Sequence, residues 1–398
     1  MSDLPLSGIR VADFCHGWAG PYMTNLLADF GAEVIKIESK YGSSNARTPD
    51  PARGNYSLAE FHRNKLGTTL NMNMPEAVEI AKQLIKISDV VTENFSLRVM
   101  KKWGLDYEHV REINPGIIMA SLQGLGQTGP HKDYVTWGPN LMPLTGMTYE
   151  WGFPDLPKPS GTKMAYPDFV AGVHGACAIV AALNYRSQTG KGQYIDLAQL
   201  EATAAMMPVV FLDYTANGRI QERNGNRSRD FAPQGCYRCQ GEDEWCMISV
   251  TTQEQWESFC HLLGNPSWAQ DERFSTMRGR IRHADELDER IEEWTQTQTP
   301  RAVMEKLQAA GIPAGIVHDA RSLIDDPHLN ARNSVIQIDH PGMGNVLHAN
   351  VPMRLSKTPG TIERPAPEMG EHNDYVFRGL LGLSSKDIEE LGKRGVFE

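Results

Sequence analysis

The chain of 398 residues lacks several features that would place it in a specialised class. It has no basic excess, because the formal charge is −10 and the isoelectric point about 5.7, which argues against nucleic acid or an anionic membrane as a partner. No stretch approaches the ~18 apolar residues that cross a bilayer. Residues 1–5 show neither the basic nor the apolar region of a secretion leader. We therefore expect a cytoplasmic protein without a membrane partner.

Cysteine is scarce, with six residues scattered over the chain. Cys236 and Cys239 have the C-x-x-C spacing of a zinc knuckle or a redox pair. A structural zinc site needs a second such pair, and only Cys246 and Cys260-His261 follow. We therefore expect buried, reduced thiols, as is typical of the cytosol, and no metal site.

The residues that are present predict an α/β fold. Short apolar strands at 9–14, 33–37, 89–92 and 117–121 alternate with helical segments at 21–30, 75–87 and 99–113. This alternation predicts parallel strand pairing and an open, Rossmann-like sheet. Ligands bind beyond the carboxyl ends of such strands, so the loops near Gly17, Ser39 and Asn94 are the expected binding surface.

The length exceeds that of one ordinary domain, so we expect a second, smaller α/β domain. A mainly helical stretch follows Gln199, and the run 218–229 is rich in Gly, Asn and Arg, as loops are. The expected boundaries are a large domain of residues 1–200 and 325–398, a linker over 201–229 and a small domain over 230–324.

One carboxylate, Asp168, stands just before a run of small and apolar residues that predicts a buried helix as far as Leu183. Pro167 restricts the backbone ahead of it, and Gly172 and Gly175 allow another backbone or a ligand to approach. Asp168 is then either a helix N-cap or a nucleophile whose charge the first-turn amides stabilise. Spacing alone favours the cap.

Several motifs occur in order along the chain: Ala19–Pro21, Leu26–Glu38, Asn64-Lys65, Asp89–Phe95, Gly126–Pro130 and Thr189–Gln193. In these motifs the sequence resembles the class III CoA-transferases, the family of formyl-CoA transferase and carnitine CoA-transferase. The resemblance covers essentially the whole chain. It implies a Rossmann-like large domain with a small domain, and two subunits interlocked as a homodimer or as a heteromer with a related subunit.

The resemblance also implies a reaction. Asp168, with His174 six positions further on, matches the family's catalytic spacing, so Asp168 would carry an acyl-aspartyl anhydride and then an aspartyl-CoA thioester. The substrates would be an acyl-CoA, such as succinyl-CoA, and a free carboxylic acid. Coenzyme A would enter as a substrate, and no tightly bound cofactor is expected.

Binding residues follow from the same resemblance. Asn94, Lys102, Lys40 and Arg47 match positions or segments that contact CoA. Any one of the three cations taken alone fits a solvated surface charge better, but as a set beside a strand end they favour a polyphosphate. His16 and Trp18 stand where the family places residues that face the acyl group. Trp137, together with Trp18, hints at a larger or aromatic acyl group, and core packing is the alternative for both. A second carboxylate of the acceptor could meet His131, Lys132, Arg227 or Arg229.

Two other activities remain open. The α-methylacyl-CoA racemases of the same family carry a Gly-His-Asp segment that is missing here, so His131 or His174 would have to supply the base. Gly124, Gly126 and Gly129 form a G-x-G-x-x-G after a strand, as in nicotinamide-dependent oxidoreductases, but Pro130 opens no good helix. The segment 229–235 also lacks the glycine-rich run of formyl-CoA transferase.

Overall fold

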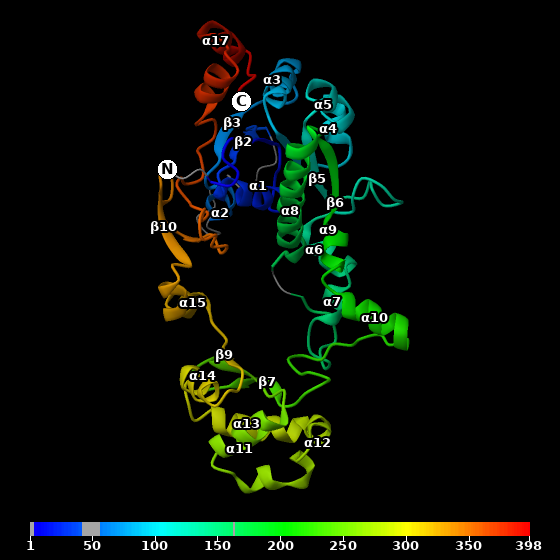
Figure 1. The fold of residues 1–398 in the computed structure, drawn as a ribbon, viewed down its shortest axis with the longest axis vertical. Helices are drawn as coiled ribbons and strands as arrows, with labels where there is room; N and C mark the ends of the chain where they lie inside the picture. Colours follow the sequence, from blue (N-terminus) through cyan, green and yellow to red (C-terminus); the bar gives the residue numbers. More distant parts are fainter. Residues whose placement is uncertain (1–3, 42–55, 162–163) are drawn as a thin grey trace. The chain divides into compact units, whose positions relative to one another are not determined.

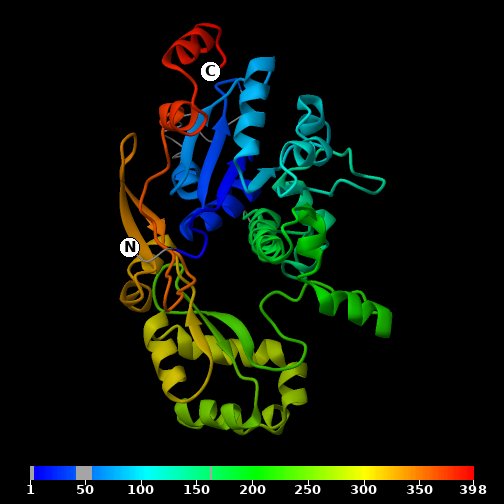
Figure 2. The same cartoon turned by 45° about the horizontal axis from the view of Figure 1, so that its top comes forward.

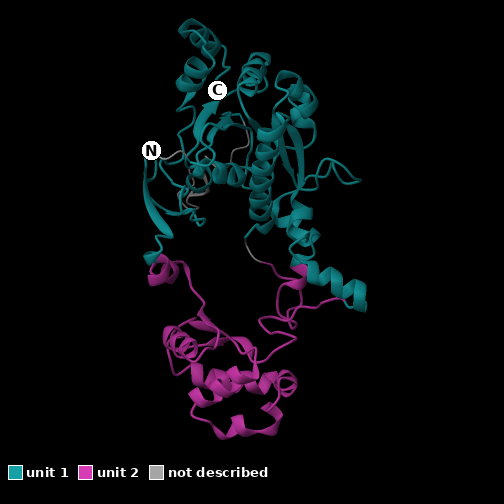
Figure 3. Ribbon diagram, viewed as in Figure 1, with its two compact units in different colours: residues 1–147, 162–219, 330–398 teal, residues 148–161, 220–329 magenta. Residues whose placement is uncertain are grey.

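The computed structural model describes residues 4–41, 56–161 and 164–398 (Figure 1). The chain forms two compact units (Figure 3). The first contains residues 1–147, 162–219 and 330–398, and the second contains residues 148–161 and 220–329. The first unit is therefore assembled from three separate stretches of chain.

The first unit is organised around a six-stranded sheet in the order β3-β2-β1-β4-β5-β6 with every neighbouring pair parallel. The strands are β1 (Arg10–Asp13), β2 (Glu33–Glu38), β3 (Leu66–Thr69), β4 (Val90–Glu93), β5 (Ile118–Gln123) and β6 (Gln193–Ala198). The expected open parallel sheet is confirmed. Because the strand order reverses between β1 and β4, the crevice beyond their carboxyl ends is the place where such sheets bind ligands.

Helices cover both faces of this sheet (Figure 2). The helices of the first unit and its edges are α1 (Ala19–Asp29), α2 (Tyr56–His62), α3 (Pro75–Lys86), α4 (Arg98–Trp103), α5 (Tyr107–Ile113), α6 (Gly138–Leu144), α7 (Met147–Glu150), α8 (Tyr166–Thr189), α9 (Gln199–Ala204), α10 (Pro208–Asn217), α16 (Pro327–Ala331), the π-helix η4 (Asp374–Leu380) and α17 (Ser385–Lys393). A hairpin of β10 (Val335–His340) and β11 (Gly344–Ala349) completes the unit.

The alternation of side chains along the strands divides the core into two layers. On one face, Ala12 and Val91 pack with apolar residues of α3, α5 and η4. On the other face, Val11 and Val90 pack with α1 and α8. This two-sided burial is typical of a doubly wound parallel sheet.

Two glycines of α8 let it lie directly on α1. A Cβ at Gly172 would stand 2.7 Å from Tyr22 Cδ1 and 3.1 Å from the Ala19 carbonyl oxygen, and one at Gly175 would stand 2.5 Å from Met23 Sδ. The close approach expected from these glycines is confirmed. Contrary to the sequence-based expectation, α8 is long and apolar enough to cross a membrane by length and composition alone. Its contacts with α1 and the sheet are those of a helix in a folded domain.

The second unit contains a three-stranded antiparallel sheet in the order β7-β8-β9. Its elements are β7 (Gln234–Arg238), β8 (Trp245–Ser249), β9 (Ala314–Ile316), α11 (Gln253–Leu262), η2 (Ser267–Gln270), η3 (Glu272–Phe274), α12 (Met277–Arg282), α13 (Ala284–Thr295), α14 (Pro300–Ala309) and α15 (Ala320–Ile324). Cys239, Cys246 and Cys260 are buried in its core.

Three sequence expectations need correction. The helix expected over 99–113 is two helices, because Gly104 adopts a φ of 63° and ends α4. Strand β3 was not foreseen. The linker expected over 201–229 contains part of α9 and all of α10, and only its residues 205–207 and 218–229 lie outside helices and strands.

Candidate active site

A buried polar network shapes the loop that follows β1. Asp13, the last residue of β1, accepts hydrogen bonds from the Cys15 amide at 3.0 Å and from Thr92 Oγ1 at 3.1 Å. Its second oxygen accepts from Thr24 Oγ1 at 2.7 Å and from Lys65 Nζ at 3.1 Å. Burial would raise the pKa of Asp13, but Lys65 and the other donors outweigh it and hold that pKa at about 2. The carboxylate is therefore charged and fixes the loop.

Asn94 joins this loop to the end of β4. Its Oδ1 accepts from the His16 amide at 2.8 Å, and its Nδ2 donates to the His16 carbonyl oxygen at 2.6 Å. A Cβ on Gly20 would stand 2.4 Å from Cys15 Sγ and 3.3 Å from Asn94 Cγ, so only glycine lets the start of α1 come this close. The structure thus brings His16, Gly17 and Asn94 together at the switch point between β1 and β4.

His16 is neutral in this setting. Burial and the nearby Lys36 ammonium lower the pKa of His16 to about 4. The imidazole lies 5.1 Å from the Phe95 ring, centroid to centroid. It offers a substrate an uncharged hydrogen-bonding group rather than a cation.

Asp168 lies in the first turn of α8 and is not its N-cap. The helix begins at Tyr166, and the N-cap is Ala165, which makes no side-chain cap bond. Asp168 instead donates its backbone amide to the Ala165 carbonyl oxygen at 3.0 Å. The cap interpretation, which spacing alone favoured, is wrong, because the helix starts two positions before the carboxylate, with Pro167 in its first turn.

The Asp168 carboxylate has no hydrogen bond to any residue that the structure describes, and burial raises its pKa to about 6. The start of α6 comes close to the carboxylate: a Cβ on Gly138 would stand 2.8 Å from Asp168 Oδ2. A partly buried carboxylate without hydrogen-bond donors is poorly stabilised, and therefore more nucleophilic than a solvated one.

Aromatic rings adjoin Asp168. The ring of its neighbour Phe169 lies 6.2 Å from Trp18, 5.1 Å from Tyr22 and 6.0 Å from Phe61. Trp18 is 40% exposed, which leaves part of its surface open to a ligand. This cluster links Asp168 to the loop after β1, which contains His16 and Gly17. Trp137, the N-cap of α6, is 70% exposed and directly precedes Gly138.

The three cations expected to bind CoA differ from one another in their surroundings. Lys40 lies just beyond the carboxyl end of β2, but its ammonium forms an ion pair with Glu398 at 2.6 Å. Lys102 lies exposed in the last turn of α4, with no ion pair to a residue in the described ranges. Arg47 lies outside the described residues.

The other candidate polar residues give no support to a second base or a second carboxylate site. His131 is exposed and lies 4.5 Å from the Tyr134 ring, and His174 is exposed with Nδ1 2.8 Å from the Val170 carbonyl oxygen. Residues six apart do not share a helix face, so His174 does not accompany Asp168. Arg227 is engaged by Asp285 and Asp288, each at 2.7 Å.

The glycine motif after β5 does not have the dehydrogenase arrangement. No helix follows Gly124–Gly129; residues 124–137 form turns, and α6 begins only at Gly138. A dinucleotide site of that type needs the amides of a helix start directly after the glycines.

The sequence missed Gly138, Phe61, Phe169 and the Asp13–Lys65 pair. Phe169 directly follows Asp168 in the sequence, so its place beside the carboxylate could have been predicted. Gly138 and Phe61 come from distant elements, and no local pattern marks them.

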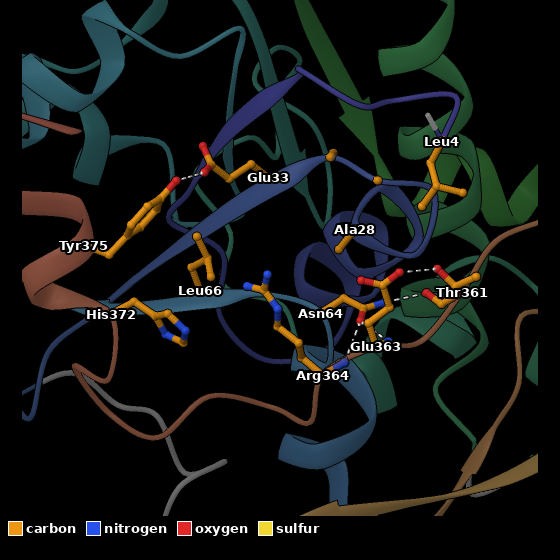
Figure 4. A pocket seen from close by; sticks show the side chains of 12 residues that line it. Leu4, Ala28, Glu33, Asn64, Leu66, Thr361, Glu363, Arg364, His372 and Tyr375 are labelled. Atoms are coloured by element: carbon orange, nitrogen blue, oxygen red, sulfur yellow. Dashed lines mark hydrogen bonds between the residues drawn. The ribbon is translucent and has the colours of Figure 1, made fainter. Parts of the chain in front are cut away.

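A cavity of about 500 Å³ lies at the amino ends of the strands, at the end of the sheet opposite His16 and Asn94 (Figure 4). Glu33 and Leu66, the first residues of β2 and β3, line it together with Arg364, His372 and Tyr375. None of the predicted site residues lines this cavity. It belongs to the amino ends of the strands, where parallel sheets do not place their ligand sites.

The fold and these residues define a class: a doubly wound α/β protein with hydrogen-bonded polar loops at its switch point and a carboxylate of raised pKa at the start of α8. Comparison with known proteins makes the class specific. CoA-transferase family III matches residues 6–373, and the chain belongs to that family. The resemblance read from the motifs is thereby confirmed.

Two relatives come from Chloroflexus aurantiacus. The chain is 34% identical over 397 residues to succinyl-CoA–D-citramalate CoA-transferase, covering 98% of each chain. It is 32% identical over 398 residues to the succinyl-CoA–L-malate CoA-transferase beta subunit, covering 99% of this chain and 98% of the relative. A solved structure of a CAIB/BAIF family protein from Brucella suis superposes with a TM-score of 0.87 at 30% identity, over 96% of this chain and all of that one. The protein is a CoA-transferase.

Proposed function

We propose that this enzyme moves CoA from succinyl-CoA to a free organic acid, with Asp168 as the covalent carrier. The names of the two Chloroflexus relatives support succinyl-CoA as the donor. The observation that carries the proposal is the Asp168 carboxylate, which is partly buried, lacks a hydrogen bond among the described residues and has a pKa raised to about 6.

The proposed reaction has four balanced steps. The Asp168 carboxylate attacks the thioester carbonyl of succinyl-CoA, which forms a mixed anhydride and releases CoA thiolate. The thiolate attacks the aspartyl carbonyl, which leaves an aspartyl-CoA thioester and free succinate. The acceptor carboxylate attacks that thioester and releases the thiolate again. The thiolate then attacks the acceptor's carbonyl, which gives the new acyl-CoA and restores Asp168.

Each step needs a developing oxyanion to be stabilised. We assign this role to the Gly138 amide at the start of α6, beside Asp168 Oδ2, because in the first turn of α8 the Tyr166 and Asp168 amides already donate to the Met164 and Ala165 carbonyl oxygens and Pro167 has no N–H. One such donor is worth about 3 kcal/mol in comparable sites.

For CoA we propose the switch-point crevice. Asn94 and Gly17 would line it, and His16 would offer its neutral ring to the acyl group. Lys102 would meet a phosphate as a point charge. Lys40 would have to exchange Glu398 for a phosphate, and Arg47 stays a prediction from the sequence.

Trp18 and Phe169 would form one wall for the acyl group next to Asp168. Trp137 would flank the other side, because it precedes Gly138. Rings in these places would exclude water from the anhydride and thioester, in a chain without a glycine-rich loop at 229–235.

We also propose that two subunits associate. Helix α10 buries none of its residues and exposes Val209, Phe211, Leu212 and Tyr214. Helix α8 exposes Val173 and Val180. Exposed apolar side chains in such numbers on one helix are typical of an interface, and the interlocked family dimer supplies a partner for them. A related second subunit, as the beta-subunit relative has, is the alternative.

Mass spectrometry of the Asp168 peptide tests the proposal. After incubation with succinyl-CoA we expect a CoA-sized adduct on Asp168 that hydroxylamine removes. Asp168→Asn should abolish the adduct and lower transfer by at least ~10³-fold while the fold is retained. Substantial transfer by Asp168→Asn contradicts the assignment, and α-proton exchange without CoA transfer would indicate a racemase.

A further inference from the structure

Glu93, the last residue of β4, is a buried carboxylate that the proposed reaction does not use. It is only 1% exposed. Its Oε2 accepts a hydrogen bond from the Phe95 amide at 2.8 Å, and its Oε1 accepts one from Gln127 Nε2 at 3.3 Å. One side chain thus connects the loop after β4 to the turn after β5.

Asp196 on β6 holds the same turn from the other side. The backbone amide of Gln127 donates to both Asp196 oxygens, at 3.1 and 3.2 Å. Gly126 has a φ of +77°, and a Cβ there would stand 3.3 Å from the Ala198 Cβ, so the turn fits closely against β6. Glu93 and Asp196 together fix Gln127 by its side chain and its backbone.

The residues beside Glu93 reach the loop after β1. Phe95 lies against the His16 ring, and its carbonyl oxygen accepts from Gln123 Nε2 at 2.8 Å. Asn94 makes the two hydrogen bonds to the His16 backbone described above. The position of the chain directly after Glu93 therefore determines where His16 lies.

This arrangement carries an electrostatic cost. Burial and the nearby Asp196 carboxylate raise the pKa of Glu93 to about 7. A buried carboxylate beside a second, exposed one costs stability unless it makes hydrogen bonds that offset the cost. Glu93 and Asp196 accept such bonds from Phe95, in the loop after β4, and from Gln127, in the turn after β5.

We propose that Glu93 is a positioning residue. It holds the Asn94-Phe95 loop and the Gly126-Gln127 turn in one fixed arrangement at the carboxyl ends of the strands, where CoA is proposed to bind. The inference rests on the proposed function, because it assumes that CoA binds at this edge. Glu93 itself touches no substrate, and its effect passes through Asn94, Phe95 and Gln127.

Steady-state kinetics of Glu93→Ala and Gln127→Ala test the inference. Each is expected to raise KM for succinyl-CoA about tenfold, while kcat changes less than about threefold, because the binding edge loosens and Asp168 is untouched. The double variant should be no worse than either single variant, since both remove the same connection. Glu93→Gln, which keeps the side chain's shape and one acceptor oxygen, should have an intermediate KM.

Glu79→Ala is the matched control. It removes an exposed carboxylate whose ion pair among the described residues is with Lys82 on α3, and KM should not change. An unchanged KM in Glu93→Ala, a fall in kcat alone, or additive single variants would overturn the inference. Calorimetry separates it from the proposed function: failure of the wild-type chain to bind CoA contradicts that function, whereas CoA binding unaltered by Glu93→Ala contradicts only the positioning role.

Discussion

At the scale of single residues, two carboxylates of the first unit have opposite surroundings. Asp13 accepts four hydrogen bonds, one of them from the Lys65 ammonium, and its pKa is held at about 2. Asp168 accepts none from a described residue, and burial raises its pKa to about 6. A carboxylate whose lone pairs are all engaged is a structural anchor, whereas one left without donors keeps its lone pairs for a carbonyl carbon.

The raised pKa predicts a pH dependence of the reaction. The nucleophile is the ionised form, and burial favours the neutral acid, so Asp168 is mostly protonated below pH 6 and ionised above it. We expect kcat/KM for succinyl-CoA to rise with pH through about 6 and to level off near 7. Initial rates from pH 5 to 8 measure this profile. A flat profile across that range contradicts the role given to Asp168.

At the scale of elements, three helices determine where Asp168 lies. Helix α8 rests on α1 through Gly172, and the start of α6 meets the first turn of α8 at Gly138. Both contacts depend on the absence of a Cβ, so helix spacing and the position of the carboxylate are set together.

Adding one methyl group at the second contact should therefore displace the nucleophile. In Gly138→Ala the new Cβ would stand 2.7 Å from the Ala165 Cβ and 2.8 Å from Asp168 Oδ2. We expect kcat to fall by about 100-fold with little change in melting temperature, because small misplacements of reacting groups are costly. Gly315→Ala on β9 is the control, since a Cβ there meets nothing within 4 Å. Equal activity of the two variants would show that α6 does not constrain Asp168.

The elements also show what local sequence can predict. Strands β1, β2, β4, β5 and β6 were predictable, because each is an apolar run bounded by turn residues and separated by helices. Strand β3 has only four residues, one of them Gly67, which is too short for a periodic signal. The motif around Asp168 predicts a nucleophile, but the close approach of Gly138, 30 residues earlier, depends on the fold, and no local pattern contains that information.

At the scale of the whole molecule, distant parts of the chain close the first unit. Asn64, with a φ of 62°, donates to Asp29 Oδ1 and to the Thr361 carbonyl oxygen, both at 2.8 Å. Its Oδ1 accepts the amides of Glu363 at 2.8 Å and Arg364 at 3.1 Å. The sequence marked Asn64 as part of a motif, but only the fold shows that this motif fastens the C-terminal segment.

Removing the side-chain hydrogen bonds of Asn64 should destabilise the first unit. Asn64→Gly keeps the backbone freedom that a positive φ requires and deletes all four side-chain hydrogen bonds. We expect the free energy of unfolding to fall by about 2–4 kcal/mol, at about 1 kcal/mol for each bond. Thermal or denaturant unfolding of the full chain measures this. Asn73→Gly, at an exposed turn, should change stability far less. A loss of stability no larger than that of Asn73→Gly would show that the Asn64 hydrogen bonds do not stabilise the first unit.

The tail also covers the edge of the sheet. Strand β3 is an edge strand, and its Gly67 amide donates to His372 Nδ1, a partner 305 residues later in the chain. The Thr69 amide likewise donates to Asn373 Oδ1 at 2.9 Å, and Thr69 Oγ1 to the Phe397 carbonyl oxygen at 2.8 Å.

During synthesis, strand β3 is made long before the C-terminal residues that cover it. At ~5–20 residues per second the ribosome needs roughly 15–60 s to make the residues between β3 and its cover. For that period the nascent sheet has an uncovered edge, which other strands can join. A message cut short near its end would yield chains with the complete Asp168 region and a permanently open edge. The C-terminal residues that cover β3 thus decide whether a newly made copy avoids pairing its open edge with another strand long enough to fold.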